Sequence, residues 1–114
     1  MKYNSNYAYD LKIGKVKEKE LGKIFETKTI EVKNDLKARE TGNVFIEYQN
    51  KGIKSGISTS ESEYYCFALG DTFHLMKIEV LKQKCRKYLG TKRDVYGGDS
   101  NTSKGILLPL SELV

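Results

Sequence analysis

The sequence is poor in the residue types that build histidine-based active sites, zinc sites and disulfide frameworks. Its 114 residues include one histidine, two cysteines, one proline and no tryptophan. A His-based triad or a Cys/His zinc site is therefore not expected, because His74 has no second histidine or close cysteine cluster to work with. Cys66 and Cys85 are expected to be reduced thiols, as is usual in the cytosol.

Long hydrophobic runs are also lacking. No stretch approaches the ~20 apolar residues that span a bilayer, and residues 1–7 contain no hydrophobic region of the kind found in a secretory signal. We therefore expect a cytoplasmic protein with no membrane partner. At 114 residues the chain is expected to form one domain, 1–114, with residues 1–10 as an N-terminal arm.

Charge is plentiful, and its balance is positive. Twenty Lys and Arg residues stand against 15 Asp and Glu residues, which gives a net charge of +5. An excess of this size favours polyanions over acidic proteins as partners, although a lysine-rich surface also serves solubility. Nucleic acid is therefore a candidate partner on charge alone.

The hydrophobic pattern predicts a mixture of helices and strands. Apolar residues recur at helical spacing or at a two-residue spacing in successive segments. Helices are expected at 11–26, 60–69 and 79–89, strands at 27–33, 44–49, 54–58, 73–78 and 106–110, and a turn-rich segment at 91–103. Asn50-Lys51-Gly52 has the composition of a tight turn, and Pro109 suggests a sheet edge. The order, α-β-β-β-α-β with a helix and a C-terminal strand appended, indicates an α/β fold.

Alternation places polar side chains on one face of two predicted strands. If Ile30 and Val32 face the core, Asp35 faces the other side, and Glu47 and Gln49 share a face of the next strand. Antiparallel pairing of these strands would bring the two carboxylates close together. Like charges at that distance are stabilised by a cation, and Mg²⁺ prefers one or two carboxylates. Acidic residues on the exposed face of a strand are also common without any such role.

The same stretch carries a family resemblance. Glu-Val-Lys-Asn-Asp at residues 31–35, Thr-Gly-Asn at 41–43 and Ile-Glu-Tyr at 46–48 resemble the PD-(D/E)XK nuclease superfamily, in particular its small phage-encoded nuclease-like proteins. Residues 51–59 resemble the Gly-x-x-Ser-Gly-Ile segment of that group, and residues 97–99 and 105–110 resemble its ending. The resemblance covers most of the chain from Leu11 onward.

The resemblance implies a restriction-endonuclease-like core, a mixed sheet flanked by helices, and a metal-dependent deoxyribonuclease acting in phage DNA metabolism. It implies that Asp35 and Glu47 bind Mg²⁺ or Mn²⁺. The motif's lysine position is Gln49, which could orient an attacking water by hydrogen bonding but has no charge. Lys33 or Lys54 could supply that charge from a neighbouring strand.

Further expectations follow from the same resemblance. Members of the superfamily often draw a metal-binding carboxylate from the first helix. A Gly-x-x-x-Glu spacing indicates Glu18 for this position, with Glu20 as the alternative. Basic residues are expected to hold the DNA backbone: Lys33, Lys51, Lys54, Lys82, Lys84, Arg86 and Lys87. The run from Lys82 to Lys87 is also typical of an ordinary solvated helix face. Members of the superfamily often dimerise, so a homodimer is among the expectations, and a phage protein would work in the cytoplasm of its bacterial host.

Two other functions stay open at this point. The first is a DNA-binding protein on the same fold whose catalysis was lost with the lysine at Gln49. The second is a structural or phage–host interaction protein that uses its tyrosine-rich N-terminal arm as the contact surface.

Overall fold

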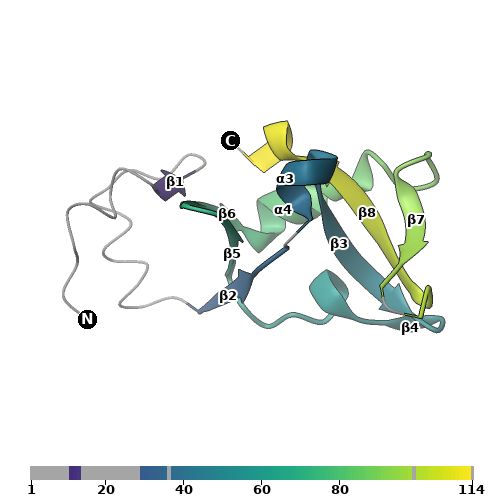
Figure 1. Ribbon diagram of the computed structural model, residues 1–114. Helices are drawn as coiled ribbons and strands as arrows, with labels where there is room; N and C mark the ends of the chain where they lie inside the picture. The colour runs from purple at the N-terminus through teal and green to yellow at the C-terminus, as the bar shows by residue number, and fades with distance from the viewer. Residues whose placement is uncertain (1–10, 14–28, 36, 99, 114) are drawn as a thin grey trace.

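The computed structural model describes residues 11–13, 29–35, 37–98 and 100–113 (Figure 1). These residues form a mixed α/β structure. The elements are β1 (Leu11–Ile13), β2 (Ile30–Lys33), α3 (Ala38–Thr41), β3 (Asn43–Asn50), β4 (Ile53–Lys54), the 3-10 turn η1 (Gly56–Ser58), β5 (Tyr64–Leu69), β6 (Thr72–Lys77), α4 (Ile78–Arg86), β7 (Asp94–Gly97), β8 (Ser103–Pro109) and the 3-10 turn η2 (Leu110–Leu113).

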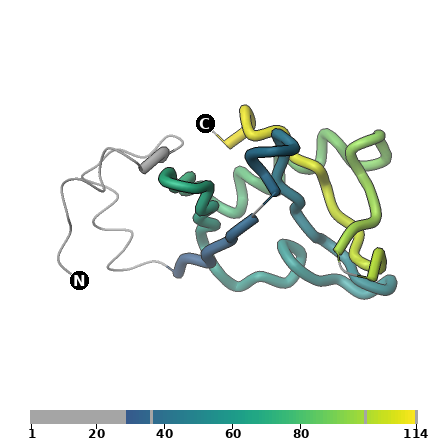
Figure 2. The backbone as a smooth tube through the Cα atoms, in the orientation of Figure 1, coloured from purple at the N-terminus to yellow at the C-terminus, as the bar shows by residue number. Residues whose placement is uncertain are grey.

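The strands form two four-stranded sheets. The first sheet has the order β1-β6-β5-β2, and the second has the order β4-β3-β8-β7. The chain crosses from one sheet to the other after β2, after β4 and after β6, as Figure 2 allows the reader to follow. Each sheet is thus assembled from segments that are distant in the sequence.

The first sheet is mixed. β5 and β6 form an antiparallel hairpin, and β1 and β2 add to its two sides in parallel with β6 and β5. β5 is covered on both faces. Tyr65, Phe67 and Leu69 belong to the main core, whereas Tyr64 and Cys66 pack in a smaller cluster with Leu75.

The second sheet is antiparallel throughout. β3 pairs with β8 along its length and with β4 through a two-residue hairpin, and β7 covers the far side of β8. The hairpin residues Lys51 and Gly52 have φ values of 52° and 80°. Two successive positive φ values are what a type I′ turn requires, so the expected tight turn is present.

One main core joins the two sheets and the helix. α4 contributes Ile78, Leu81 and Cys85, and the sheets contribute residues from β3, β5, β6 and β8. In Figure 1, α4 lies between the first sheet and β8. Within the described residues, no helix is long and apolar enough to cross a membrane.

Several expected elements are confirmed and others are wrong. The strands near 27–33, 44–49, 73–78 and 106–110 and the helix near 79–89 are present. The expected helix at 60–69 is instead β5, because its apolar residues face cores on both sides and so show no alternation. Residues 11–13 are a strand instead of the start of a helix; the N-terminal arm and residues 14–26 lie outside the described residues.

Other corrections concern how the strands are placed. β2 and β3 belong to different sheets, so the expected antiparallel pair between them does not exist. Val32 is 64% exposed instead of facing the core. The strand expected at 54–58 is the two-residue β4 followed by η1, the turn-rich segment contains β7, and Pro109 ends an inner strand instead of marking a sheet edge.

A carboxylate near the C-terminus ties η2 to the end of α4. Glu112 accepts hydrogen bonds from Lys87 Nζ and Tyr88 Oη, each at 2.6 Å, and from Lys84 Nζ at 3.4 Å. These donors lower the pKa of Glu112 from its ordinary 4.5 to about 2, with the Lys87 bond as the largest cause. Lys84 and Lys87 are therefore committed to an internal ion pair.

The low pKa of Glu112 predicts how stability varies with pH. Because the folded state lowers this pKa, the stabilisation is present above about 4.5 and is lost as the pH falls towards about 2. Glu112→Gln should lower the free energy of unfolding at pH 7 by roughly 1–3 kcal/mol, and should remove part of the acid dependence below pH 4.5. Urea unfolding at several pH values tests this, with the exposed Glu61→Gln as control; equal effects of the two changes would contradict it.

Candidate functional site

Asp35 lies beside the first residues of β3, as expected. There it satisfies a backbone amide on the unpaired side of the strand. Its Oδ2 accepts a hydrogen bond from the backbone N–H of Phe45 at 3.2 Å, and its Oδ1 accepts one from the N–H of Lys37 at 3.1 Å. The first bond satisfies an amide on the side of β3 that lacks a partner strand at this point. Both oxygens of Asp35 thus have a structural task.

Glu47 is held by the segment that follows the β3–β4 hairpin. Ser55 Oγ donates a hydrogen bond to Glu47 Oε2 at 2.8 Å. Gly56 has a φ of +54°, and a Cβ there would lie 2.2 Å from the Glu47 carbonyl oxygen. This close approach requires glycine. Among the described residues Glu47 Oε1 has no hydrogen-bond partner, so one oxygen of a positioned carboxylate is available.

Glu31 and Lys33 form a second charged group on β2. Their Oε2 and Nζ atoms are 2.6 Å apart, and Ser60 Oγ donates to Glu31 Oε1 at 2.8 Å. The Lys33 ammonium also lies 5.2 Å from the centre of the Tyr65 ring. The hydrogen bond from Lys33 is the largest cause that lowers the pKa of Glu31, so this carboxylate is ionised at neutral pH.

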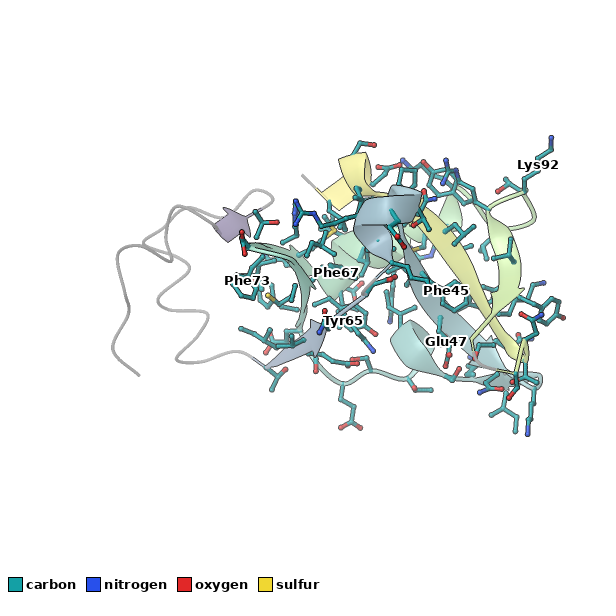
Figure 3. All side chains as sticks on the ribbon, viewed as in Figure 1. Phe45, Glu47, Tyr65, Phe67, Phe73 and Lys92 are labelled. Atoms are coloured by element: carbon teal, nitrogen blue, oxygen red, sulfur yellow. The ribbon has the colours of Figure 1, made fainter. Side chains whose placement is uncertain are left out.

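A hollow between the two sheets is lined by both Lys33 and Glu47. It has a volume of about 220 Å³ and is lined by Lys33, Phe45, Ile46, Glu47, Gly56, Tyr65 and Phe67; we call it the Glu47 hollow. Figure 3 shows Tyr65 and Phe67 on the side of the first sheet and Phe45 and Glu47 on the side of β3. A neighbouring hollow shares Lys33, Phe45 and Phe67 but contains Asp35 instead of Glu47.

Tyr65 links the two glutamates electrostatically. The pKa of its phenol is raised to about 12; burial is the largest cause, and the charges of Glu31 and Glu47 both contribute to the rise. Both carboxylates therefore act on the same phenol. A phenol with this pKa stays protonated at neutral pH and can donate a hydrogen bond but cannot accept a proton.

Phe45 is positioned by glycines on the neighbouring strands. A Cβ on Gly105 would lie 2.7 Å from the Phe45 ring, and one on Gly97 would lie 3.1 Å from it. The ring therefore rests on β8 and β7 where these strands have no side chains. This contact accounts for two of the glycines in the C-terminal part of the sequence.

Gln49 does not share a face with Glu47. The ladder between β3 and β8 shifts by one residue between them, so that Glu47 pairs with Gly105 and Gln49 pairs with Lys104. A shift of one residue exchanges the faces of a strand, because side chains alternate. Gln49 thus leaves the sheet on the face opposite the Glu47 hollow, and the expected grouping of Asp35, Glu47 and Gln49 is wrong for Gln49.

The remaining predicted site residues are dispersed. Glu18, like its alternative Glu20, lies outside the described residues. Lys51 is exposed in the hairpin turn, and Lys54 lies on β4 beside Gln49. Lys33, expected as a DNA contact, instead lines the hollow and pairs with Glu31.

Sequence reasoning missed Glu31 as a site residue, and it missed its neighbours Ser55, Ser60 and Tyr65. A signal for Glu31 was present, since Glu31-Val32-Lys33 has an acid-x-lysine spacing and alternation puts both charged residues on one face. Ser55 and Ser60 could not be found this way, because they reach their carboxylates through loops.

The donor set suits a cation that needs few protein ligands. No group of three or more His, Cys, Asp or Glu side chains in the described part of the chain could enclose a metal ion. Glu47 and Lys33 line the hollow, and Glu31, which pairs with Lys33, is the second carboxylate next to it. Mg²⁺ is commonly bound by one or two carboxylates together with waters and substrate phosphates, so these residues fit it.

Comparison with known proteins gives no assignment. No family model matches the sequence, and neither the curated proteins nor the solved structures contain a match.

The close approach of Gly56 to Glu47 predicts a strong effect of one methyl group. Gly56→Ala should destabilise the fold because its Cβ collides with the Glu47 carbonyl, by roughly 1–3 kcal/mol beyond the strain of a positive φ. Gly52→Ala is the matched control, since Gly52 has a φ of +80° but no atom within 4 Å. Thermal unfolding of both variants tests this; equal losses would contradict the proposed contact.

The ion pair on β2 predicts a change in titration. Lys33→Met should raise the pKa of Glu31 towards its ordinary value of 4.5, because the largest cause of its lowering is removed. Side-chain carboxyl chemical shifts, followed by NMR from pH 2 to 7, measure this. Lys37→Met should leave the titration of Glu31 unchanged, and an unchanged Glu31 in the Lys33 variant would contradict the pairing.

Proposed function

We propose that the protein is a metal-dependent DNA endonuclease that hydrolyses phosphodiester bonds, with Glu31, Lys33 and Glu47 as its central residues. The observation that carries the proposal is the Glu47 hollow. The hollow is lined by a lysine and by Glu47, one carboxylate oxygen of which has no hydrogen-bond partner among the described residues. That lysine stands two residues after an acid on one strand, which is the spacing of the superfamily's motif.

The proposal includes a restriction-endonuclease-like core. What supports it is the mixed first sheet, in which the acid-x-lysine strand β2 runs parallel to β5. The proposed site differs from the expected one in its lysine. Lys33 takes the part that the motif position at Gln49 leaves empty, and Asp35 serves mainly to cap β3.

Glu47 and Glu31 are the carboxylates proposed to hold Mg²⁺ or Mn²⁺. When bound, such an ion supplies a water of lowered pKa and stabilises negative charge on the phosphate. Ser55 and Ser60 keep the two carboxylates in place by donating to one oxygen of each.

The other residues of the hollow are suited to orient a phosphate group and to exclude bulk water. The Lys33 ammonium can move from Glu31 to a phosphate oxygen, where its charge offsets the charge that develops during hydrolysis. The protonated Tyr65 phenol can donate a hydrogen bond in the same space. Phe45 and Phe67 keep the walls apolar, which limits the entry of bulk water.

A second function, DNA binding without cleavage, is favoured by two observations. Lys33 and Glu31 already satisfy each other at 2.6 Å, and both oxygens of Asp35 hold backbone amides. In this form the charged residues stabilise the junction of the two sheets, and the net positive charge carries the affinity.

A cleavage assay tests the proposal. Single-stranded, duplex and branched DNA are incubated with the purified protein and Mg²⁺ or Mn²⁺. Glu47→Gln, Glu31→Gln and Lys33→Met should each reduce the rate by roughly 100-fold or more, which is typical for removal of a group that stabilises the transition state. Gln49→Ala should change the rate less than about 3-fold. Gln49 lies on the face of the sheet opposite the hollow, so its removal should have only the small effect of a surface substitution.

Asp35→Asn is the informative companion variant. It should retain cleavage within about 10-fold, because an amide still offers one oxygen to the Phe45 N–H and a cap is worth only ~1 kcal/mol. Loss of cleavage in Asp35→Asn but not in Glu31→Gln would indicate that Asp35, instead of Glu31, binds the metal. If the wild type binds DNA but does not cleave it, with or without metal, the enzyme proposal is wrong and the DNA-binding function is favoured.

A further inference from the structure

A second concave surface lies on the other face of β3. Its cavity, about 280 Å³ in volume, is enclosed by β3, β4, η1 and α4. Its accessible lining combines Tyr48, Lys54, Ser58, Lys82, Arg86 and Leu89 over a floor of core residues. We call it the α4 groove.

The groove gathers three basic side chains. Lys54, Lys82 and Arg86 make no ion pair or hydrogen bond within the described chain. Lys82 and Arg86 are four residues apart, which places them on one face of α4. Lys84 on the same helix and Lys87 at its C-cap instead pair with Glu112. The basic residues of α4 and its C-cap thus fall into two pairs, of which only Lys84 and Lys87 are bound to an acid within the described residues.

Apolar surface accompanies these cations. Leu89 is 50% exposed at the end of the groove. Tyr48 is half-buried, and its hydroxyl donates a hydrogen bond to Asp94 Oδ1 at 2.7 Å, which fixes the ring. An aromatic ring and an exposed leucine beside unpaired cations suit a ligand with both negative charge and flat apolar groups.

The groove and the Glu47 hollow open on either side of one short turn. Gly56 lines the hollow, while the next residues of η1, Ile57 and Ser58, line the groove. On β3, Ile46 and Tyr48 lie on the groove side of Glu47.

We propose that the α4 groove binds a single strand of nucleic acid, with phosphates at Lys54, Lys82 and Arg86 and a base against Tyr48 and Leu89. Bases in a duplex are stacked and face inward, so only an unpaired strand offers one to a cavity of this size. The inference rests on the nucleic-acid partner of the proposed function but does not depend on cleavage.

Binding of a fluorescent 20-nucleotide oligothymidylate in EDTA tests the groove without metal or cleavage. Lys82→Ala/Arg86→Ala should weaken binding at least about 10-fold and reduce the slope of log K against log salt by roughly 1.4, the value for two contacts with a single strand. Lys84→Ala/Lys87→Ala removes the same charge from the same helix and should weaken binding less than about 3-fold.

Two single substitutions test the groove without disturbing the ion pairs of Lys84 and Lys87 with Glu112. Lys54→Ala should weaken binding of the oligothymidylate, and Lys92→Ala should not; Lys92 projects from the loop between α4 and β7 (Figure 3). A duplex of equal length should lose less affinity than the oligothymidylate in the groove variants. Equal losses in the two α4 double variants, or no binding of the oligothymidylate by the wild type, would overturn the inference.

Cleavage at the Glu47 hollow and binding in the α4 groove can be tested independently of each other. If the wild type cleaves DNA and the groove variants bind and cleave as it does, the groove proposal falls and the enzyme stands. If no DNA is cleaved but binding depends on Lys82 and Arg86, the enzyme falls and the groove stands.

Discussion

The inner face of β5 is the constraint on which the rest of the structure depends. Tyr65 and Phe67 are each 2% exposed, pack edge to face with ring centres 5.9 Å apart, and belong to the core that joins both sheets to α4. The same rings line the Glu47 hollow. The site is therefore built directly on the core, so its lysine and glutamates inherit a rigid support from packing that the fold needs in any case.

Small irregularities of the second sheet decide which side chains the site contains. Alternation places Tyr48, like Ile46, on the side of the α4 groove, and the bulge after Glu47 turns Gln49 away from the hollow. Gly56 lets the loop after β4 approach Glu47 closely enough for Ser55 to hold its carboxylate. Two concave surfaces with different linings thus arise on the two faces of one strand. One is lined by Glu47 and Lys33, and the other by cations that make no ion pair within the described residues.

Local pattern predicted much of the fold, and long-range pairing limited the rest. The strands at β3, β6 and β8 and the helix α4 follow from alternation and helical spacing. β5 did not, because a strand buried on both faces resembles a helix in composition. The site shows the same division: Asp35 was correctly expected beside the start of β3 and Glu47 on its outer face. Gln49 was misplaced because a bulge reverses alternation, and Ser55 reaches Glu47 only through a loop.

The central claim is that a divalent cation binds in the hollow lined by Glu47 and Lys33, with Glu31 beside Lys33 as the second carboxylate. Anomalous diffraction from crystals soaked with Mn²⁺ tests it most directly. The account predicts a peak in the Glu47 hollow at roughly 2.0–2.2 Å from Glu47 Oε1, a ligand distance typical of small divalent cations at carboxylates. No peak there at saturating Mn²⁺, with Lys33 still paired to Glu31, would contradict the account.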